Sequence, residues 1–156
     1  MKKIFAAIII VTTLYACGNQ NGNSTATSGS GESQTSTGNP AYDPKRGEGK
    51  FKTVEVTSNL DAAMAENGNK VFSVKCGSCH KTTGEKLVGP GWKGVTARRS
   101  APWIMNFITN TDEMLSKDPA AQAQLEICLV RMPNQNLSDT DARNLYEFMR
   151  KNDGIK

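Results

Sequence analysis

The run Cys76-Gly77-Ser78-Cys79-His80 constrains this chain more than any other feature of its sequence. The run holds two of the 4 cysteines and the single histidine of the chain. Two thiols three residues apart, with an imidazole directly after the second, match the pattern for covalent attachment of a haem. The thiols add to the two vinyl groups on one edge of the macrocycle, and the adjacent imidazole reaches the iron. We therefore expect one haem c, bound through Cys76 and Cys79 and ligated by His80.

Two other uses of this cysteine pair are possible. A thioredoxin-like dithiol also has two cysteines at this spacing, but it belongs to a βαβ unit, and the flanking sequence predicts helix and loop. A structural zinc site needs four ligands. Beyond the cysteine pair, the chain offers only His80 and Cys128 for that purpose. Haem attachment is therefore the preferred interpretation.

The single histidine also limits the second axial position of the iron. With His80 in use, ligation by two histidines, a second haem of the same kind and a distal histidine for peroxidase chemistry are all excluded. The sixth ligand must be a methionine, a lysine, another side chain or nothing.

Met132 is the methionine that the sequence favours as sixth ligand. Pro133 follows it, and a proline keeps the preceding residue out of helical conformation. A helix is predicted to start at Ser138, so Met132 lies on an extended segment that is fixed at its far end. Such a segment can present a ligand to the iron.

The other methionines of the mature chain fit this role less well. Met105 and Met149 fall in apolar helical stripes, where filling the core is the usual role of methionine. Met64 is too near the cysteine pair in sequence to reach the opposite face of the haem. Met114, in a predicted polar loop, is the alternative ligand.

The order of these features resembles that of the monohaem class I cytochromes c, over residues 59–152. The resemblance implies an all-α fold with about four helices wrapped around one covalently bound haem. It implies a single-electron carrier and not an enzyme. The matching motifs, in chain order, are a helix entering Cys76-Gly77-Ser78-Cys79-His80, then Leu87-Val88-Gly89-Pro90, then Met132-Pro133, then Leu137-Ser138-Asp139 at the start of the last helix.

The resemblance also implies roles for residues around the haem. The carbonyl of Pro90 would accept a hydrogen bond from the second ring nitrogen of His80, which orients the ring and raises its basicity. Arg98 or Arg99 would pair with a haem propionate. Trp92 would pack near the haem edge, with ordinary core filling as the alternative.

Capping signals and apolar periodicity predict the helices themselves. No alternating run is long enough to predict a sheet. Residues 81–97 are expected to form a Gly- and Lys-rich loop. The first expected helix starts at the capping pair Ser58 and Asp61 and continues to Val74, with an interruption at Asn67-Gly68. The other three expected helices start at Ser100-Ala101-Pro102, at Asp118-Pro119 and at the pair Ser138 and Asp141.

The N-terminus predicts export and attachment to a membrane. Two lysines precede an apolar run that is shorter than the roughly 20 residues needed to span a bilayer, which indicates a cleaved signal over residues 1–16. Its ending, Leu14-Tyr15-Ala16-Cys17, resembles the bacterial lipobox, which implies acylation of Cys17. An ordinary secretory signal is the alternative. The expected location is the bacterial cell envelope, on the periplasmic side of a membrane.

The polar tract over residues 17–49 contains almost no apolar side chains, so we expect a disordered, lipid-anchored linker. Residues 50–156 then form the folded domain. This domain has 15 basic and 12 acidic side chains. Such a balance gives no concentrated basic face, and we expect no nucleic-acid partner and no small-molecule substrate.

The remaining cysteine, Cys128, has no expected partner in the chain. It is interpreted as a small buried apolar residue, with a redox-active or dimer-forming thiol as the alternative.

The expected function is to pass single electrons between a respiratory donor and a reductase or terminal oxidase. A haem-based gas sensor and an accessory electron-transfer subunit of a larger reductase or oxidase are the alternatives.

Overall fold

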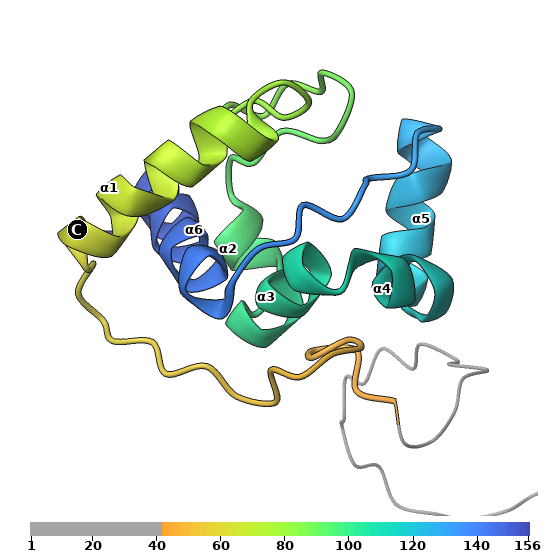
Figure 1. The fold of residues 1–156 in the computed structure, drawn as a ribbon, viewed down its shortest axis with the longest axis horizontal. Coiled ribbons are helices and arrows are strands. Elements are labelled where there is room, and N and C mark those ends of the chain that lie inside the picture. The colour runs from red at the N-terminus through yellow and green to blue at the C-terminus, as the bar shows by residue number, and fades with distance from the viewer. Residues whose placement is uncertain (1–41) are drawn as a thin grey trace, which may run out of the picture. The chain divides into compact units, whose positions relative to one another are not determined.

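The structure, a computed structural model, describes residues 42–156 (Figure 1). In this part of the chain the regular structure is entirely helical, which confirms the expected all-α class. The predicted signal peptide, Cys17 and the linker up to residue 41 lie outside the described residues. Among the helices from residue 42 onward, none has the length and apolar character required to cross a membrane.

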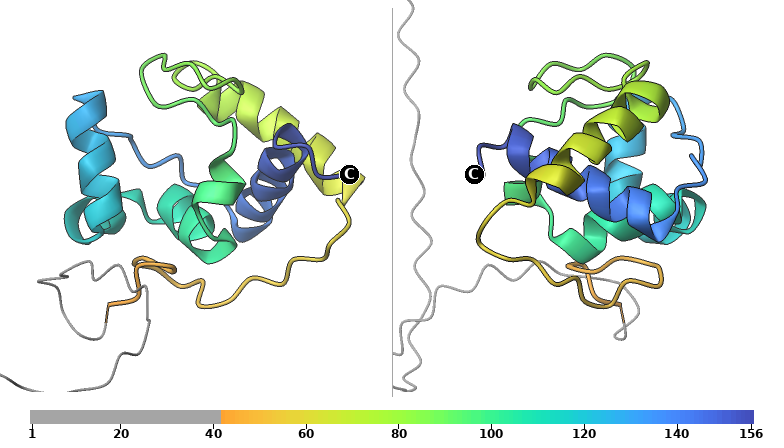
Figure 2. Two further views of the ribbon diagram at one scale, coloured as in Figure 1. Left: turned by 180° about the vertical axis from the view of Figure 1, so that it is seen from behind. Right: turned by 60° about the vertical axis from the view of Figure 1, so that its left-hand side comes forward.

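Six α-helices and one π-helical turn follow one another along residues 42–156. Helices α1 and α6 pack side by side, α6 also contacts α3, and α4 lies between α3 and α5 (Figure 2). In chain order the elements are α1 (Ala62–Val71), the π-helical turn η1 (Phe72–Cys76), α2 (Val95–Arg98), α3 (Ala101–Thr109), α4 (Thr111–Lys117), α5 (Pro119–Cys128) and α6 (Asp139–Asn152).

Three of the four predicted helix starts are confirmed. In each, the side chain of the capping residue accepts a hydrogen bond from a main-chain N–H in the first turn, which would otherwise lack a partner. The pairs are Ser100 with the N–H of Trp103 at 3.2 Å, Asp118 with that of Ala121 at 2.7 Å, and Ser138 with that of Asp141 at 3.0 Å.

The first helix differs from the prediction in two ways. Its N-cap is Asp61 and not Ser58, because the Asp61 carboxylate accepts from the N–H of Met64 at 2.9 Å. The helix also continues through Asn67 and Gly68 without interruption. A Cβ atom on Gly68 would lie 2.1 Å from the main-chain oxygen of Asn144. This glycine therefore permits the close approach of α1 to α6 and does not break the helix.

The two helices that the sequence did not predict, α2 and α4, lack a local capping signal. Helix α2 follows Gly94, whose φ is 75°, and receives its cap from the other end of the domain. The carboxylate of Asp153 accepts hydrogen bonds from the N–H groups of Gly94 and Thr96, the latter at 2.9 Å. Helix α4 follows Asn110 and has no side-chain cap.

The expected position of Met114 in a polar loop is wrong. Met114 lies on α4 and is fully buried, at 0% exposure. Its thioether sulfur lies 3.0 Å from the main-chain nitrogen of Glu48, which donates to it. The exposed polar residues around Met114 form the outer face of a short helix, and Met114 lies on its buried face with Thr111 and Leu115.

Residues 42–49, which we assigned to the linker, pack against α3 and α4. The side-chain amide of Asn106 donates to the carbonyl of Arg46 at 3.0 Å, and that of Asn110 donates to the carbonyl of Glu48 at 3.2 Å. The hydroxyl of Tyr42 donates to the carboxylate of Asp118. The composition of residues 42–49 did not predict that they pack on the domain, because the segment has few apolar residues. Side chains of the domain hold it instead, through hydrogen bonds to its main-chain carbonyls.

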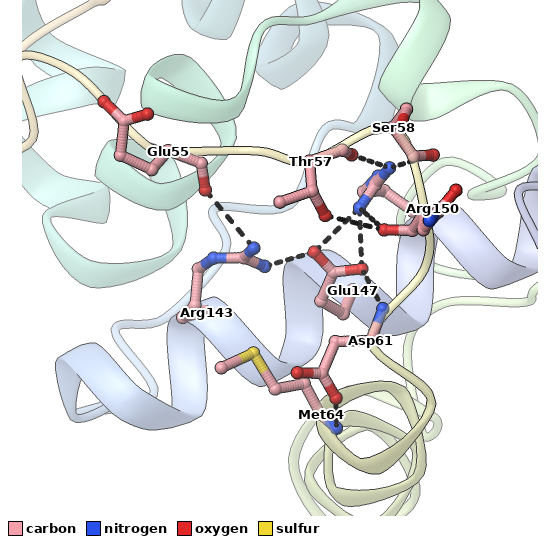
Figure 3. A network of polar contacts seen from close by, with 9 residues as sticks. Glu55, Thr57, Ser58, Asp61, Met64, Arg143, Glu147 and Arg150 are labelled. Carbon is pink, nitrogen blue, oxygen red and sulfur yellow. Dashed lines mark hydrogen bonds and ion pairs between the residues drawn. The ribbon is translucent and has the colours of Figure 1, made fainter.

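A buried ion cluster fastens the segment before α1 to α6 (Figure 3). The Glu147 carboxylate is fully buried, and both of its oxygens lie 2.9 Å from one nitrogen of Arg150. Arg143 pairs with the same carboxylate at 2.6 Å. The two guanidinium groups also donate to main-chain carbonyls of the segment, from Arg150 to Thr57 at 2.7 Å and from Arg143 to Glu55 at 3.4 Å.

Removal of the central carboxylate should therefore destabilise the domain strongly. Glu147→Ala leaves two guanidinium groups without their counter-charge, and such a change in a buried pair costs about 3–5 kcal/mol. The matched control is Glu113→Ala, which removes a carboxylate from the exposed pair with Lys117 and should cost less than about 1 kcal/mol. Denaturant unfolding of both variants measures the difference. Equal losses of stability would contradict the role assigned to Glu147.

Candidate haem-binding site

A cavity of about 260 Å³ lies between the loop that follows Cys79 and the segment that connects α5 to α6. Cys76 does not line the cavity; it is buried, at 5% exposure, and packs in the same core as Trp92. The structure thus brings the predicted site residues together from distant parts of the sequence. Those that line the cavity are Cys79, His80, Pro90, Trp92, Arg98 and Met132.

The imidazole of His80 is held by the loop that follows it. Its Nδ1 lies 2.9 Å from the carbonyl oxygen of Pro90, to which it donates a hydrogen bond when the proton is on that nitrogen. The N–H groups of Val88 and Gly89 donate to the carbonyl of Cys79 and fold the loop back over the ring. A Cβ atom on Gly89 would lie 2.3 Å from the ring of His80, so this close approach requires glycine.

The charge state of His80 suits a metal ligand. Burial lowers the pKa of the imidazole, and this outweighs the hydrogen bond to Pro90, which raises it. The ring is therefore neutral at pH 7. With Nδ1 bonded to the Pro90 carbonyl, Nε2 is the nitrogen left for a metal, and the neutral imidazole is the form that ligates metals.

The two cysteines precede this imidazole at the end of a widened helical turn. η1 ends at Cys76, and the carbonyl of Cys76 accepts hydrogen bonds from the N–H groups of Cys79 at 3.0 Å and His80 at 2.9 Å. This turn brings Cys79 and His80 to the lining of the cavity, and Cys76, shortly before them in the sequence, lies buried in the core. Burial raises the pKa of the Cys76 thiol to about 11, so as a free thiol it is protonated at neutral pH. π-Helical turns of this kind are frequent at functional sites.

Trp92 is both a core residue and a cavity residue. It is 6% exposed, and its ring centroid lies 4.8 Å from that of Phe72 and 5.6 Å from that of His80. Phe72 in turn contacts Phe148 of α6, with centroids 5.3 Å apart. The aromatic group connects the loop after His80 to the α1–α6 pair.

Met132 also lines the cavity, from the non-helical segment after α5. Pro133 lines the cavity beside it. The alternative ligand Met114 does not line the cavity, and its sulfur is occupied by the Glu48 N–H. Met105 is buried in the core, and Met149, also expected in the core, is buried and borders the cavity from α6.

Both candidate arginines line the cavity, and each has a second contact. A guanidinium nitrogen of Arg98 donates to the carbonyl of Lys93 at 2.6 Å. The guanidinium of Arg99 lies 4.6 Å from the ring centroid of Trp103, over the face of the indole. Either cation is available to a carboxylate in the cavity.

The sequence missed two contributors to the cavity. Cys128, expected to be a buried core residue, is half-buried and lines it. One apolar face of α3 also lines it, through Trp103, Ile104, Phe107 and Ile108. The periodicity of α3 predicted this face as core but could not show that it faces a cavity. A largely apolar cavity lined by Cys79, His80 and Met132 fits a planar apolar macrocycle with a central metal.

A family model described as Cytochrome c matches residues 65–153, which include the cysteine pair, the histidine and Met132. The chain belongs to the cytochrome c family. Among solved structures, it is similar to the cytochrome c from Rhodothermus marinus, with 30% identity over 67% of this chain and 90% of that one and a TM-score of 0.65. An engineered form of that cytochrome, Rma TDE, is 29% identical over 71% of this chain and 98% of its own, with a TM-score of 0.68. A further structure shows the engineered form bound to a carbene intermediate. No curated protein matches the chain.

Family membership confirms the class I cytochrome c fold and one covalently bound haem c with its iron. It thereby decides against the dithiol and zinc alternatives for the cysteine pair. Members of the family carry electrons, and so does this cytochrome c.

Proposed function

We propose that this cytochrome c binds its haem through Cys76 and Cys79, with His80 and Met132 as the two axial ligands. The observation that supports this most directly is that His80 and Met132, 52 residues apart in the sequence, line the same cavity. The hydrogen bond from His80 Nδ1 to Pro90 orients the imidazole toward that cavity. The bound haem supplies a metal that takes up and releases one electron. A methionine ligand raises the potential of haem iron relative to a histidine ligand.

The other residues of the cavity exclude water and compensate charge. Trp92 and the apolar face of α3 keep the dielectric around the macrocycle low. Arg98 or Arg99 pairs with a propionate. With both axial positions filled by side chains, there is no open site for a substrate, and the protein transfers electrons without a chemical reaction of its own.

The binding of carbon monoxide separates a carrier from a gas sensor. Carbon monoxide needs a free axial position on the reduced iron, so the reduced protein should not bind it near neutral pH. Absorption spectra before and after exposure to the gas measure this, together with reversible one-electron reduction and oxidation. Prompt formation of a carbon monoxide complex at pH 7 would favour the sensor.

We further propose that acylated Cys17 anchors the protein to a membrane of the bacterial cell envelope, with the domain facing the periplasm. The lipobox-like Leu14-Tyr15-Ala16-Cys17 supports this, as does the covalent haem, which is attached outside the cytoplasm. The polar composition of the stretch between Cys17 and the domain suits a tether. Such a tether lets the domain reach a respiratory donor and a reductase or terminal oxidase in the same membrane at a high effective concentration.

Replacement of the lipidated cysteine tests the anchor. Cys17→Ser should release a soluble periplasmic cytochrome with an unchanged haem spectrum, because the substitution lies far from the cavity in sequence. Fractionation of cells into periplasm and membranes measures the distribution. If the variant still sediments quantitatively with membranes, the anchor is not at Cys17.

A further inference from the structure

The segment that connects α5 to α6 has little regular structure of its own. Figure 1 shows it as a single stretch of chain between the two helices. Its internal hydrogen bonds are local, from the side chain of Gln135 to the carbonyl of Pro133 at 3.2 Å and from the N–H of Asn136 to the side chain of Asn134 at 2.9 Å. These bonds shape the segment but do not attach it to the domain. Attachment must come from other parts of the chain.

Lys86 attaches the last turn of α5, directly before the segment, to the loop after His80. Its ammonium donates to the carbonyl of Ile127 at 2.8 Å. Lys86 lies two residues before Val88, and Ile127 lies one residue before Cys128, and both Val88 and Cys128 line the cavity. The bond therefore connects the loop that holds His80 to the end of α5, from which the segment that carries Met132 starts.

Lys75 supplies a second attachment on the other side of Met132. Its ammonium donates to the carbonyl of Gln135 at 3.0 Å. Lys75 directly precedes Cys76, so this bond joins the turn that carries Cys76 and Cys79 to the segment between α5 and α6 that carries Met132 (the methionine segment). Within residues 42–156, a third contact also fixes the segment. Arg131 of the segment pairs with Asp112 of α4 at 2.9 Å.

We propose that Lys75 and Lys86 are positioning residues that hold Met132 against the haem iron by bonding the main chain before and after it. The proposal rests on Met132 as the sixth ligand. A thioether is a neutral, weak donor, and ordering a free segment costs conformational entropy. Hydrogen bonds from an ammonium group are stronger than those between neutral groups. Two of them, at residues 127 and 135, keep the methionine close to its bound position even when its sulfur leaves the iron.

Cyanide binding to the oxidised protein measures how readily the sulfur leaves, because cyanide needs the position that Met132 occupies. Lys75→Ala and Lys86→Ala should each increase the rate of cyanide binding about three- to tenfold, the effect of one lost hydrogen bond. The double variant should show about the product of the two effects. Hydrogen–deuterium exchange of the main-chain amides over residues 129–137 should also become faster in each variant, and this readout does not involve the iron.

Three control variants separate the hydrogen bonds from the charge. Lys86→Arg keeps both charge and donor and should restore a rate near that of the wild type. Lys81→Ala removes a lysine next to His80 that pairs with Glu85 at 2.7 Å, and Lys151→Ala removes one at the end of α6. Neither should change cyanide binding or exchange over residues 129–137 appreciably. Equal acceleration in Lys81→Ala and Lys86→Ala would show an effect of charge alone and overturn the proposal.

Failure of the positioning proposal and failure of the ligand assignment give different experimental results. If Lys75→Ala and Lys86→Ala leave exchange over residues 129–137 at the wild-type rate, the lysines do not position the segment. If Met132→Ala binds cyanide no faster than the wild type, Met132 is not the ligand, and exchange over the segment still reports on the two lysine bonds.

Discussion

The variant Met132→Ala should lose the weak near-infrared charge-transfer band that a methionine–iron bond gives an oxidised cytochrome c. The haem should remain attached, because Cys76, Cys79 and His80 are unchanged. The reduced variant should bind carbon monoxide, because the axial position is no longer filled by a side chain. Its potential should fall by on the order of 0.1 V or more as water or a stronger donor replaces sulfur, within the roughly 0.8 V over which axial ligands set haem potentials. Optical spectra and a redox titration measure these changes.

Met114→Ala is the matched control for this experiment. Met114 is fully buried on α4 and does not line the cavity, so its truncation should lower the stability of the domain by about 2–5 kcal/mol. The band and the potential should remain close to those of the wild type. A band that survives in Met132→Ala and disappears in Met114→Ala would show that the ligand assignment is wrong.

The double variant Cys76→Ala/Cys79→Ala should contain no covalently attached haem. In the proposed site both thioether bonds require these sulfurs, and axial bonds from His80 and Met132 would not survive denaturation. The loss of the attached macrocycle also removes the apolar contacts that fill the cavity, so the domain should unfold at much lower denaturant concentrations. Mass spectrometry of the denatured chain measures attached haem directly.

Cys128→Ala is the control for the cysteine pair. Cys128 lines the same cavity, but it lies at the end of α5, beside the methionine segment. The Cys128→Ala variant should keep one attached haem per chain. Covalent haem in the double variant, or its loss in Cys128→Ala, would contradict the assignment of the two attachment sites.

Features of the fold that depend on neighbours in sequence could be predicted. Ser100, Asp118 and Ser138 each cap a helix through an N–H three residues later, so the three helix starts follow from local chemistry. The same local analysis placed the first N-cap at Ser58, because both Ser58 and Asp61 can cap. It also interpreted Gly68 as an interruption. Only the approach of Asn144 from α6 explains that glycine.

Features that depend on contacts between distant residues could not be predicted. Helix α2 receives its cap from Asp153, more than fifty residues later in the chain. Residues 42–49 look like linker by composition, and their attachment comes from side chains of α3 and α4 such as Asn106.

The candidate site shows the same division between local and distant contacts. The cysteine pair and His80 were evident because attachment chemistry fixes their spacing, and Met132 because Pro133 follows it. The contacts of Lys75 with Gln135 and of Lys86 with Ile127 have no sequence signal, since exposed lysines are common and a carbonyl acceptor has no side-chain identity.

The intact mass of the purified wild-type chain after extraction with acidified acetone tests covalent haem attachment most directly. Acid and acetone remove a haem that is held only by axial ligands, whereas thioether bonds survive. We expect colourless acetone, a chain mass increased by that of one haem, and the added mass on the peptide that contains Cys76 and Cys79. Haem in the acetone phase, with the chain at its unmodified mass, would contradict covalent attachment at the cysteine pair.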